Sequence, residues 1–310
     1  MGEVLTINGC QHSDLFWAMR GGGGSTFGVI TSITLKIFPS PKILAMDFMM
    51  LVDARESFIY DMAAFIFGQL PTLGGKGMTG YTSVLARMPN PIPLPGAPEE
   101  VGGVIGVAVL QDTSEENDML KLWKPINDTV NTKWPGKVQF LPRIVAYKSY
   151  LDYINVHYDN MTTGGDFYMA SRLLDKTALT GNSKALSRAI EGVVDATDGL
   201  TAFLVAGEGI HNVVASKAFP PLNATAKAGA IKQLNTAMEP FRQLSPSTGA
   251  YINEGFPFEK DWQKTFWGEN YPRLLAIKKK IDPENVLWCH NCVGSEGWTD
   301  DKGQLCKRRN

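Results

Sequence analysis

A run of glycines between residues 21 and 28 limits the possible folds of this chain more than any other feature. The run reads Gly-Gly-Gly-Gly-Ser-Thr-Phe-Gly. Consecutive glycines let a backbone pass close to a bulky ligand and turn its N–H groups toward it, and phosphate oxygens commonly accept such hydrogen bonds. The run fits the G-x-G-x-x-G dinucleotide fingerprint in no register and lacks the Gly-Lys-Ser/Thr of a P-loop. On composition alone it is also compatible with a flexible surface loop.

The segment that follows the glycines alternates like a β-strand. The apolar side chains on its one face are those of Val29, Ile33, Leu35 and Ile37. This pattern predicts a half-buried strand over residues 29–38, which Pro39 and Pro41 would end. Because a strand and not a helix follows the glycines, the Rossmann arrangement is excluded.

Farther along the chain, strands and helices are mixed without regular alternation. Strands are predicted over residues 46–52, 101–110, 166–173 and 202–210. Helices are predicted over residues 54–70, 183–194, 224–244, 261–267 and 271–281, and another begins at Thr113 or Ser114. This order favours an α+β fold.

Charge and hydropathy argue against two classes of partner. The 310 residues include 30 Lys plus Arg and 31 Asp plus Glu, so no basic excess is available for nucleic-acid phosphates. No apolar run reaches the roughly 18 to 20 residues that span a bilayer. The basic run at residues 278–280 is expected to be a solvated helix face. We therefore expect neither a nucleic acid nor a membrane as partner.

Cys289 and Cys292 have the C-x-x-C spacing of a zinc knuckle or a redox pair. Only Cys306 follows them, so a four-ligand zinc site lacks ligands and no metal site is expected. Two possibilities stay open for these cysteines. They form a structural disulfide that involves Cys306, or they are free thiols.

Two long motifs resemble one known family. The first covers residues 14–39, DLFWAMRGGGGSTFGVITSITLKIFP, and the second joins YINE (251–254), FWGENYPRL (266–274), DP (282–283) and VLW (286–288). In this order they resemble the fungal FAD-linked oxidoreductases. These lie in the berberine-bridge-enzyme-like branch of the vanillyl-alcohol-oxidase (PCMH-type FAD-binding) superfamily. The stretch between the two motifs is similar only loosely.

The resemblance implies three parts. Residues 1–41 would be the C-terminal part of an FAD-binding domain, and residues 42–248 a substrate domain with a large antiparallel sheet backed by helices. Residues 249–310 would be the berberine-bridge-type segment that returns to the flavin domain. Family members place the first half of the FAD domain, with the histidine that links covalently to the flavin, before the glycine run. No Gly-Gly-His run occurs here, so we expect an N-terminally truncated chain.

The resemblance also implies a site. The residues whose backbone would line FAD are Gly22, Gly23, Gly24, Thr26, Phe27, Gly28 and Val29. Asn253 would lie at the isoalloxazine edge, with Asn270 as a second candidate. Tyr251 would either accept the proton of a substrate hydroxyl or pack as an aromatic ring against the flavin. Tyr251 and Asn253 alternate on a segment predicted to be extended, so their side chains are expected to point the same way.

The implied function is oxidation of a small-molecule alcohol or amine by hydride transfer to FAD, in secondary metabolism, with molecular oxygen as the acceptor. The competing hypothesis is a non-catalytic remnant or a binding glycoprotein that lacks the flavin-attachment half. Asn-x-Ser/Thr sequons occur at Asn127, Asn160 and Asn223. They favour a secreted or secretory-pathway location for the intact protein.

Overall fold

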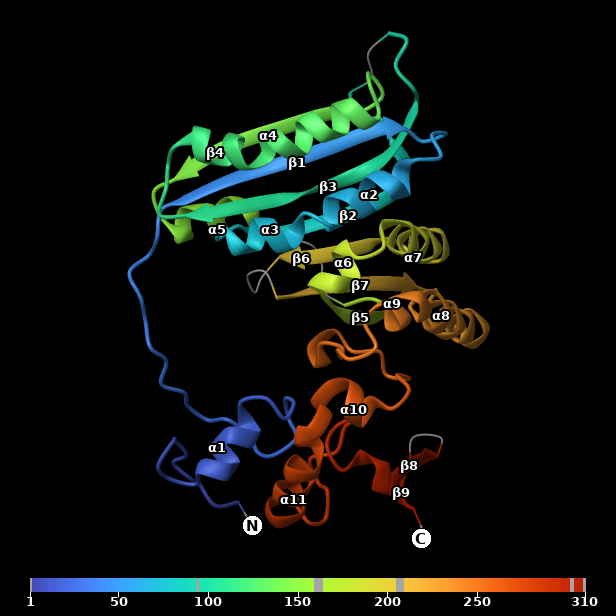
Figure 1. Cartoon of the computed structure of the whole chain (residues 1–310). Coiled ribbons are helices and arrows are strands. Elements are labelled where there is room, and N and C mark those ends of the chain that lie inside the picture. The colour runs from blue at the N-terminus through green and yellow to red at the C-terminus, as the bar shows by residue number, and fades with distance from the viewer. Residues whose placement is uncertain (1, 93–94, 159–163, 205–208, 302–303, 309–310) are drawn as a thin grey trace. The chain divides into compact units, whose positions relative to one another are not determined.

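The computed structural model describes residues 2–92, 95–158, 164–204, 209–301 and 304–308 (Figure 1). The chain divides into two units. Unit 1 combines residues 1–37 with residues 249–310, and unit 2 is the continuous stretch of residues 38–248. Both ends of the chain therefore build one unit, and the other unit is inserted between them.

Unit 2 is built on a seven-stranded sheet in the order β4-β1-β3-β2-β6-β7-β5, in which all neighbours are antiparallel. The strands are β1 Ile43–Asp53, β2 Thr79–Pro89, β3 Glu100–Gln111, β4 Gln139–Tyr147, β5 Phe167–Asp175, β6 Leu200–Leu204 and β7 Ile210–Ala218. The predicted α+β class with a large antiparallel sheet is confirmed.

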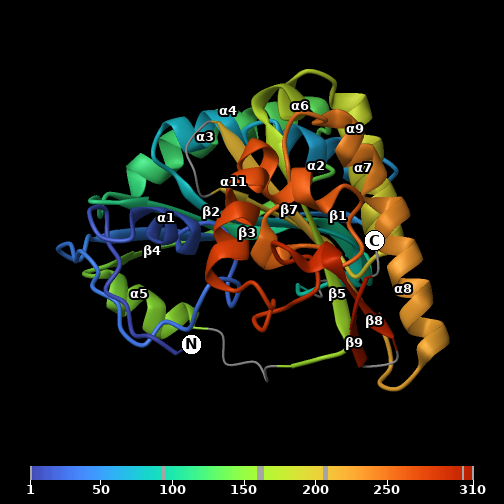
Figure 2. The ribbon, with the colours of Figure 1, turned by 90° about the horizontal axis from the view of Figure 1, so that it is seen from below.

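Helices pack on both faces of this sheet. They are α2 Ile59–Phe67, α3 Leu70–Gly75, α4 Glu116–Lys133, α5 Tyr150–His157, α6 Lys176–Thr180, α7 Ser183–Ala196, α8 Ala224–Ala237 and α9 Glu239–Leu244. Successive side chains of a strand point to opposite faces. Phe48 of β1 therefore packs on Trp123 of α4, with ring centroids 4.5 Å apart. Ala45 of the same strand faces the other way, in a cluster with Tyr153 of α5. Helix α8 contacts β5 and β7, and α5 contacts β4 at the opposite edge (Figure 2).

Unit 1 has short elements around a small core. They are α1 Ser13–Met19, the 3₁₀ turns η1 Ile252–Glu254, η2 Gly268–Asn270 and η3 Ser295–Gly297, the helices α10 Trp262–Trp267 and α11 Tyr271–Ile281, and the hairpin β8 Trp298–Asp301 with β9 Gln304–Lys307. The buried core residues are Leu15, Ala18, Phe27, Trp267, Leu274 and Val293. This core joins the two sequence motifs, although more than 200 residues separate them along the chain.

The strand predicted over residues 29–38 is wrong for this structure. All ten residues are described, and none lies in a strand or helix. Its large apolar side chains are exposed, namely those of Val29, Ile30, Ile33, Leu35, Ile37 and Phe38. Alternation specifies a strand only where another strand accepts its backbone hydrogen bonds, and no described strand pairs with this segment.

Three further differences concern unit 2. The single strand predicted over residues 202–210 is instead the two strands β6 and β7, and residues 205–208 lie outside the described residues. The helix predicted over residues 224–244 is divided into α8 and α9. Strands β2 and β4 were not predicted. In β2 the register shifts between Leu85 and Met88, and such an irregularity interrupts strict alternation.

Candidate functional site in unit 1

The glycine run forms a tight loop that follows α1. The amide of Gly22 donates to the carbonyl of Ala18 over 2.7 Å, which ends the helix. A Cβ at Gly22 would lie 2.4 Å from Cε2 of Phe27 and 2.6 Å from the Ala18 oxygen. Gly23 has φ of 100°, a conformation that side chains rarely adopt. Glycine is therefore required at both positions by local packing and backbone geometry.

The loop presents a row of backbone N–H groups without acceptors. In the described part of the chain, no backbone amide of residues 23–28 donates a hydrogen bond. Thr26 and Phe27 are only 1% and 2% exposed. Unpaired amides in buried residues are rare in folded proteins and call for a partner. The loop is therefore suited to a ligand that offers several oxygen or nitrogen acceptors.

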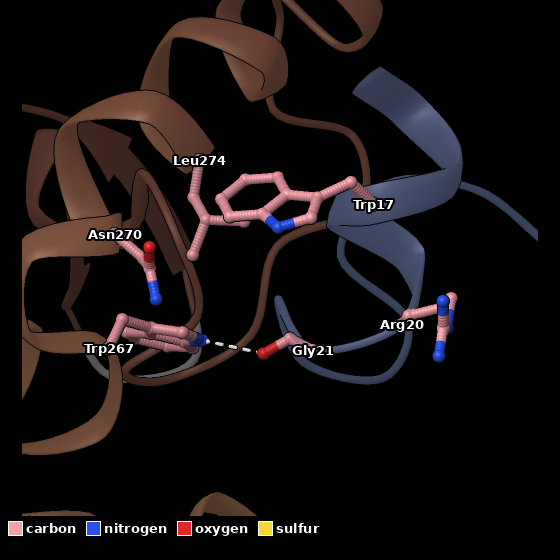
Figure 3. Close-up of a pocket in the computed structure, with 6 residues that line it drawn as sticks. All are labelled: Trp17, Arg20, Gly21, Trp267, Asn270 and Leu274. Carbon is pink, nitrogen blue, oxygen red and sulfur yellow. Dashed lines mark hydrogen bonds between the residues drawn. The ribbon is translucent and has the colours of Figure 1, made fainter. Parts of the chain in front are cut away.

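A cavity of about 330 Å³ opens beside this loop. Its lining comes from both parts of unit 1 and comprises Trp17, Arg20, Gly21, Trp267, Asn270 and Leu274 (Figure 3). The indole Nε1 of Trp267 donates to the carbonyl of Gly21 over 3.1 Å and so ties α10 to the loop. The volume lies at the lower end of the range usual for small-molecule sites.

Trp17, one of the aromatic residues that line the cavity, contacts a charged side chain. The guanidinium of Arg273 lies 3.9 Å from the ring centroid of Trp17, within cation–π range. The same guanidinium pairs with the carboxylate of Asp14 over 2.6 Å. Both charged groups are largely exposed, so we assign this contact to the orientation of Trp17 rather than to much stability.

Two predicted site residues, Tyr251 and Asn253, contact each other. Asn253 Nδ2 donates to the phenol oxygen of Tyr251 over 2.6 Å. The extended segment predicted for them is wrong, because residues 252–254 form the 3₁₀ turn η1. Ile252 between them packs against the core that contains Phe27. Tyr251 is 43% exposed, so its ring is accessible at the surface of the same unit.

The remaining predicted residues of the loop differ in what they offer. The side chains of Thr26 and Phe27 are buried, so these residues can present only their backbone. Val29 is 81% exposed and lies beyond the loop core. Asn270 is exposed and lines the cavity. Of the predicted site residues, Asn270 alone is among those that line the cavity, where it lies with Gly21, a residue that was not predicted. Tyr251 and Asn253 meet in a separate contact of the same unit.

Sequence reasoning missed Lys278 as a contact of the glycine loop, and the prediction of a solvated face is wrong for it. The side chain is only 2% exposed, whereas the neighbouring Lys279 and Lys280 are exposed. Its ammonium donates to the carbonyl oxygen of Thr26 over 2.7 Å. Helical spacing contained the signal, because Lys278 is four residues from the buried Leu274 on α11.

The cysteines pair differently from the prediction. Cys289 and Cys292 form a disulfide, with Cα atoms 5.2 Å apart, a separation that suits this bond. Cys306 is an exposed free cysteine on β9, so the disulfide predicted to involve it is wrong. Among the residues that the structure describes, no group of three or more His, Cys, Asp or Glu side chains is arranged to hold a metal.

In unit 2, polar and aromatic side chains of α5 form a cluster with Asp47 of β1. His157 stacks on Tyr153 with ring centroids 4.2 Å apart, and its Nε2 lies 3.4 Å from a carboxylate oxygen of Asp47. Burial raises the pKa of Tyr153 to about 12, so the phenol stays protonated at neutral pH. These contacts account for the cluster as packing on the sheet.

Two of the three sequons are described, and both belong to helices of unit 2. Asn223 is exposed and caps α8, where its Oδ1 accepts from the amide of Ala226 over 2.9 Å. Asn127 is half-buried within α4. Asn160 lies outside the described residues. Over the described ranges, no helix has both the length and the hydropathy to cross a membrane.

Comparisons by sequence and by structure find similar proteins of one kind. Residues 250–294 match the family model "Berberine and berberine like". FAD-linked oxidoreductase apf9 of Gibberella fujikuroi is 30% identical, over 99% of this chain and 56% of its own length. FAD-linked oxidoreductase ffsJ of Aspergillus flavipes is 29% identical, over 96% of this chain and 53% of its own length. The chain thus spans about half the length of these relatives.

The fold also has counterparts among solved structures. The VAO-type flavoprotein MtVAO713 of Myceliophthora thermophila C1 superposes with a TM-score of 0.85 at 23% identity, over 99% of this chain and 57% of that one. A xylooligosaccharide oxidase from the same organism superposes with a TM-score of 0.68 at 16% identity, over 94% and 63% of the two chains. The chain is thus similar in sequence to fungal FAD-linked oxidoreductases over about half of their length, matches the berberine-like family model over residues 250–294, and shares the fold of part of a VAO-type flavoprotein.

Proposed function

We propose that this chain supplies part of the site of an FAD-dependent oxidoreductase. The observation that carries the proposal is the row of amides in residues 23–28, which lacks acceptors in the described structure. The relatives of this chain are named FAD-linked. The phosphates, the ribityl hydroxyls and the isoalloxazine ring of FAD all offer acceptors, so the loop fits the cofactor.

The residues of unit 1 have separate roles in this proposal. The amides of the loop bind the cofactor, and the cavity between Trp17 and Trp267 offers apolar walls to a planar group. Asn253 and Asn270 provide amide groups that hydrogen-bond and orient the cofactor. FAD, when bound, supplies the two-electron acceptor for oxidation of a small-molecule alcohol or amine. Molecular oxygen is the proposed final electron acceptor.

Tyr251 is the proposed proton acceptor for the substrate. Its phenol oxygen receives the Asn253 amide, which fixes the orientation of the ring. A donor at that oxygen is the arrangement that a phenolate requires. Since the ring is half-exposed, a substrate can reach it. The relatives are named FAD-linked oxidoreductases, which favours this redox function over a binding glycoprotein.

Substitution of Gly24 tests the binding proposal. A Cβ at Gly24 meets no atom of the chain within 4 Å, and the same holds for Gly9 elsewhere in unit 1. Gly24→Ala is therefore expected to leave the thermal midpoint unchanged but to weaken FAD binding, because its methyl group occupies the surface that a ligand must approach. FAD titration followed by visible absorption measures the affinity. Gly9→Ala is the matched control and is expected to bind like wild type.

Two results would contradict the proposal. Wild-type chain that retains no FAD after gel filtration would remove the function from this chain. Equal affinities of the Gly24→Ala, Gly9→Ala and wild-type proteins would show that FAD binds elsewhere.

For the intact protein we propose a secreted or secretory location. The support is the exposed sequon at Asn223 and the disulfide between Cys289 and Cys292. Glycan attachment at Asn223 in a secreting host tests this proposal.

A further inference from the structure

The buried ammonium of Lys278 joins three segments of unit 1. It donates to the carbonyl of Thr26 over 2.7 Å, to the carbonyl of Leu287 over 2.8 Å and to Oδ2 of Asp282 over 2.7 Å. An ammonium has three donors, so each one is used. The glycine loop, α11 and the segment after α11 are thereby connected through one side chain.

Asp282 supplies the negative charge that pairs with the ammonium of Lys278. Its Oδ1 accepts from the amide of Val286 and its Oδ2 from the amide of Leu287, each over 2.9 Å. Burial alone would raise the pKa of this carboxyl. The hydrogen bonds from Lys278, Leu287 and Val286 outweigh burial and hold the pKa below its ordinary value. The two side chains therefore form a charged pair at neutral pH.

The contact to Thr26 determines the direction of the next amide. In a trans peptide the C=O and the following N–H point in opposite directions. Because Lys278 attracts the Thr26 oxygen, the N–H of Phe27 points away from the ammonium. Among the described residues, this is also the one hydrogen bond that reaches the backbone of residues 23–28 from outside that run.

We propose that Lys278 is a positioning residue for the cofactor loop. It does not touch the cofactor itself. It fixes the Thr26 carbonyl so that the loop amides are arranged to bind before a ligand arrives, and less ordering is then required on binding. The inference rests on the proposed FAD-binding function. It also assigns a role to the buried ion pair of Lys278 and Asp282, whose desolvation cost offsets its contribution to folding.

The experiment distinguishes an effect of Lys278 on the order of the glycine loop from an effect on the stability of the fold. Lys278→Met removes all three donors at similar length but leaves Asp282 as an unpaired buried charge, which destabilises the fold. The double variant Lys278→Met/Asp282→Asn removes that charge, and the asparagine oxygen can still accept from the amide of Val286 or Leu287. Lys279→Met is the matched control, because it makes the same substitution at the next residue of α11, whose side chain is exposed.

Three measurements are made on each protein. ¹⁵N relaxation of labelled glycines gives the order parameters of Gly24 and Gly28, with Gly9 as an internal reference. FAD titration gives the affinity, and thermal unfolding reports stability. For the double variant we expect the order parameters to fall from about 0.85 toward 0.6 or below, and FAD to bind about tenfold more weakly, equivalent to about 1.4 kcal/mol. The Lys279→Met protein is expected to match wild type in loop order and affinity.

The outcomes are distinguishable. If the folded double variant keeps wild-type order at Gly24 and Gly28, the positioning role is overturned, whatever the affinity. If order falls but FAD affinity is unchanged, the role is also overturned. If wild type binds no FAD, the proposed function fails for this chain, and Lys278 is then excluded as a cofactor-positioning residue. Loss of stability in the double variant with unchanged order and affinity would identify a purely structural lysine.

Discussion

The contact between Tyr251 and Asn253 shows how one residue can prepare another for chemistry. The Asn253 amide lies 2.6 Å from the phenol oxygen, and η1 holds both residues on one short turn. Such a turn brings the two side chains together within three residues of the chain. The pair is therefore defined locally, whereas the conformation of the glycine loop depends on distant residues.

We expect Tyr251→Phe to separate binding from turnover. Loss of the hydroxyl removes the proposed proton acceptor but keeps the ring, so FAD retention should be unchanged. The rate of flavin reduction by an alcohol or amine substrate should fall roughly 100-fold or more, as is usual when a general base is lost. Stopped-flow absorption measures this rate. Tyr150→Phe, an exposed tyrosine of unit 2, is the control. Unchanged flavin reduction in Tyr251→Phe would remove Tyr251 from the mechanism.

At the scale of an element, α8 combines a structural cap with a sequon. Asn223 accepts the Ala226 amide at the N-terminus of the helix, where otherwise unpaired N–H groups require an acceptor. A glycan attached through the Asn223 Nδ2 leaves Oδ1 available for this contact. Capping and glycosylation are therefore compatible at this position.

Two substitutions at Asn223 distinguish the cap from the sequon. Asn223→Ala removes both and should lower the free energy of unfolding of unit 2 by about 1 kcal/mol. Asn223→Asp removes the sequon but keeps an equivalent cap, so stability in non-glycosylated protein should stay near wild type. In a secreting host, both variants should lose one glycan by mass spectrometry. A wild-type protein that is secreted without a glycan at Asn223 would argue against this site as support for the secretory proposal.

The elements also show where sequence reasoning succeeds. The apolar periodicity of residues 183–194 predicted α7, and the continuous apolar run after residue 100 predicted β3, because buried faces dictate residue type in both. Lys278 shows the limit. A lysine within a basic run has the composition of a solvated face, and only the three-dimensional position of the Thr26 and Leu287 carbonyls explains its burial. For Cys289, Cys292 and Cys306, spacing alone did not identify the pair, although the disulfide that forms is the local one between Cys289 and Cys292.

At the scale of the whole molecule, the segment of residues 29–38 is exposed and its apolar side chains alternate with polar ones. Its alternation matches a strand, yet no described strand pairs with it. A strand-like segment that presents apolar side chains to solvent is a template for pairing with another chain. The glycine loop and this segment could thus be recognised from sequence as adjacent features. The sequence could not show that residues 29–38 form no strand here, because strand formation depends on which partner strands are available.

We expect this segment to promote self-association of the chain. Leu35→Lys with Ile37→Lys should reduce the association measured by light scattering at rising concentration, because charge on such a segment opposes strand pairing. Thr34→Lys places the same charge on the other face of the segment and should have a smaller effect. Equal scattering by wild type and the Leu35→Lys/Ile37→Lys protein would show that association, if any, uses another surface.

The insertion of unit 2 into unit 1 has a consequence for synthesis. The glycine loop leaves the ribosome well before α10 and α11, because residues 38–248 are made in between. At about 5 to 20 residues per second, this interval is roughly 10 to 40 s. During it, neither Trp267 nor Lys278 exists to hold the loop. The seven-stranded sheet is therefore in a position to fold first, and the proposed cofactor site becomes complete only as the final fifth of the chain emerges.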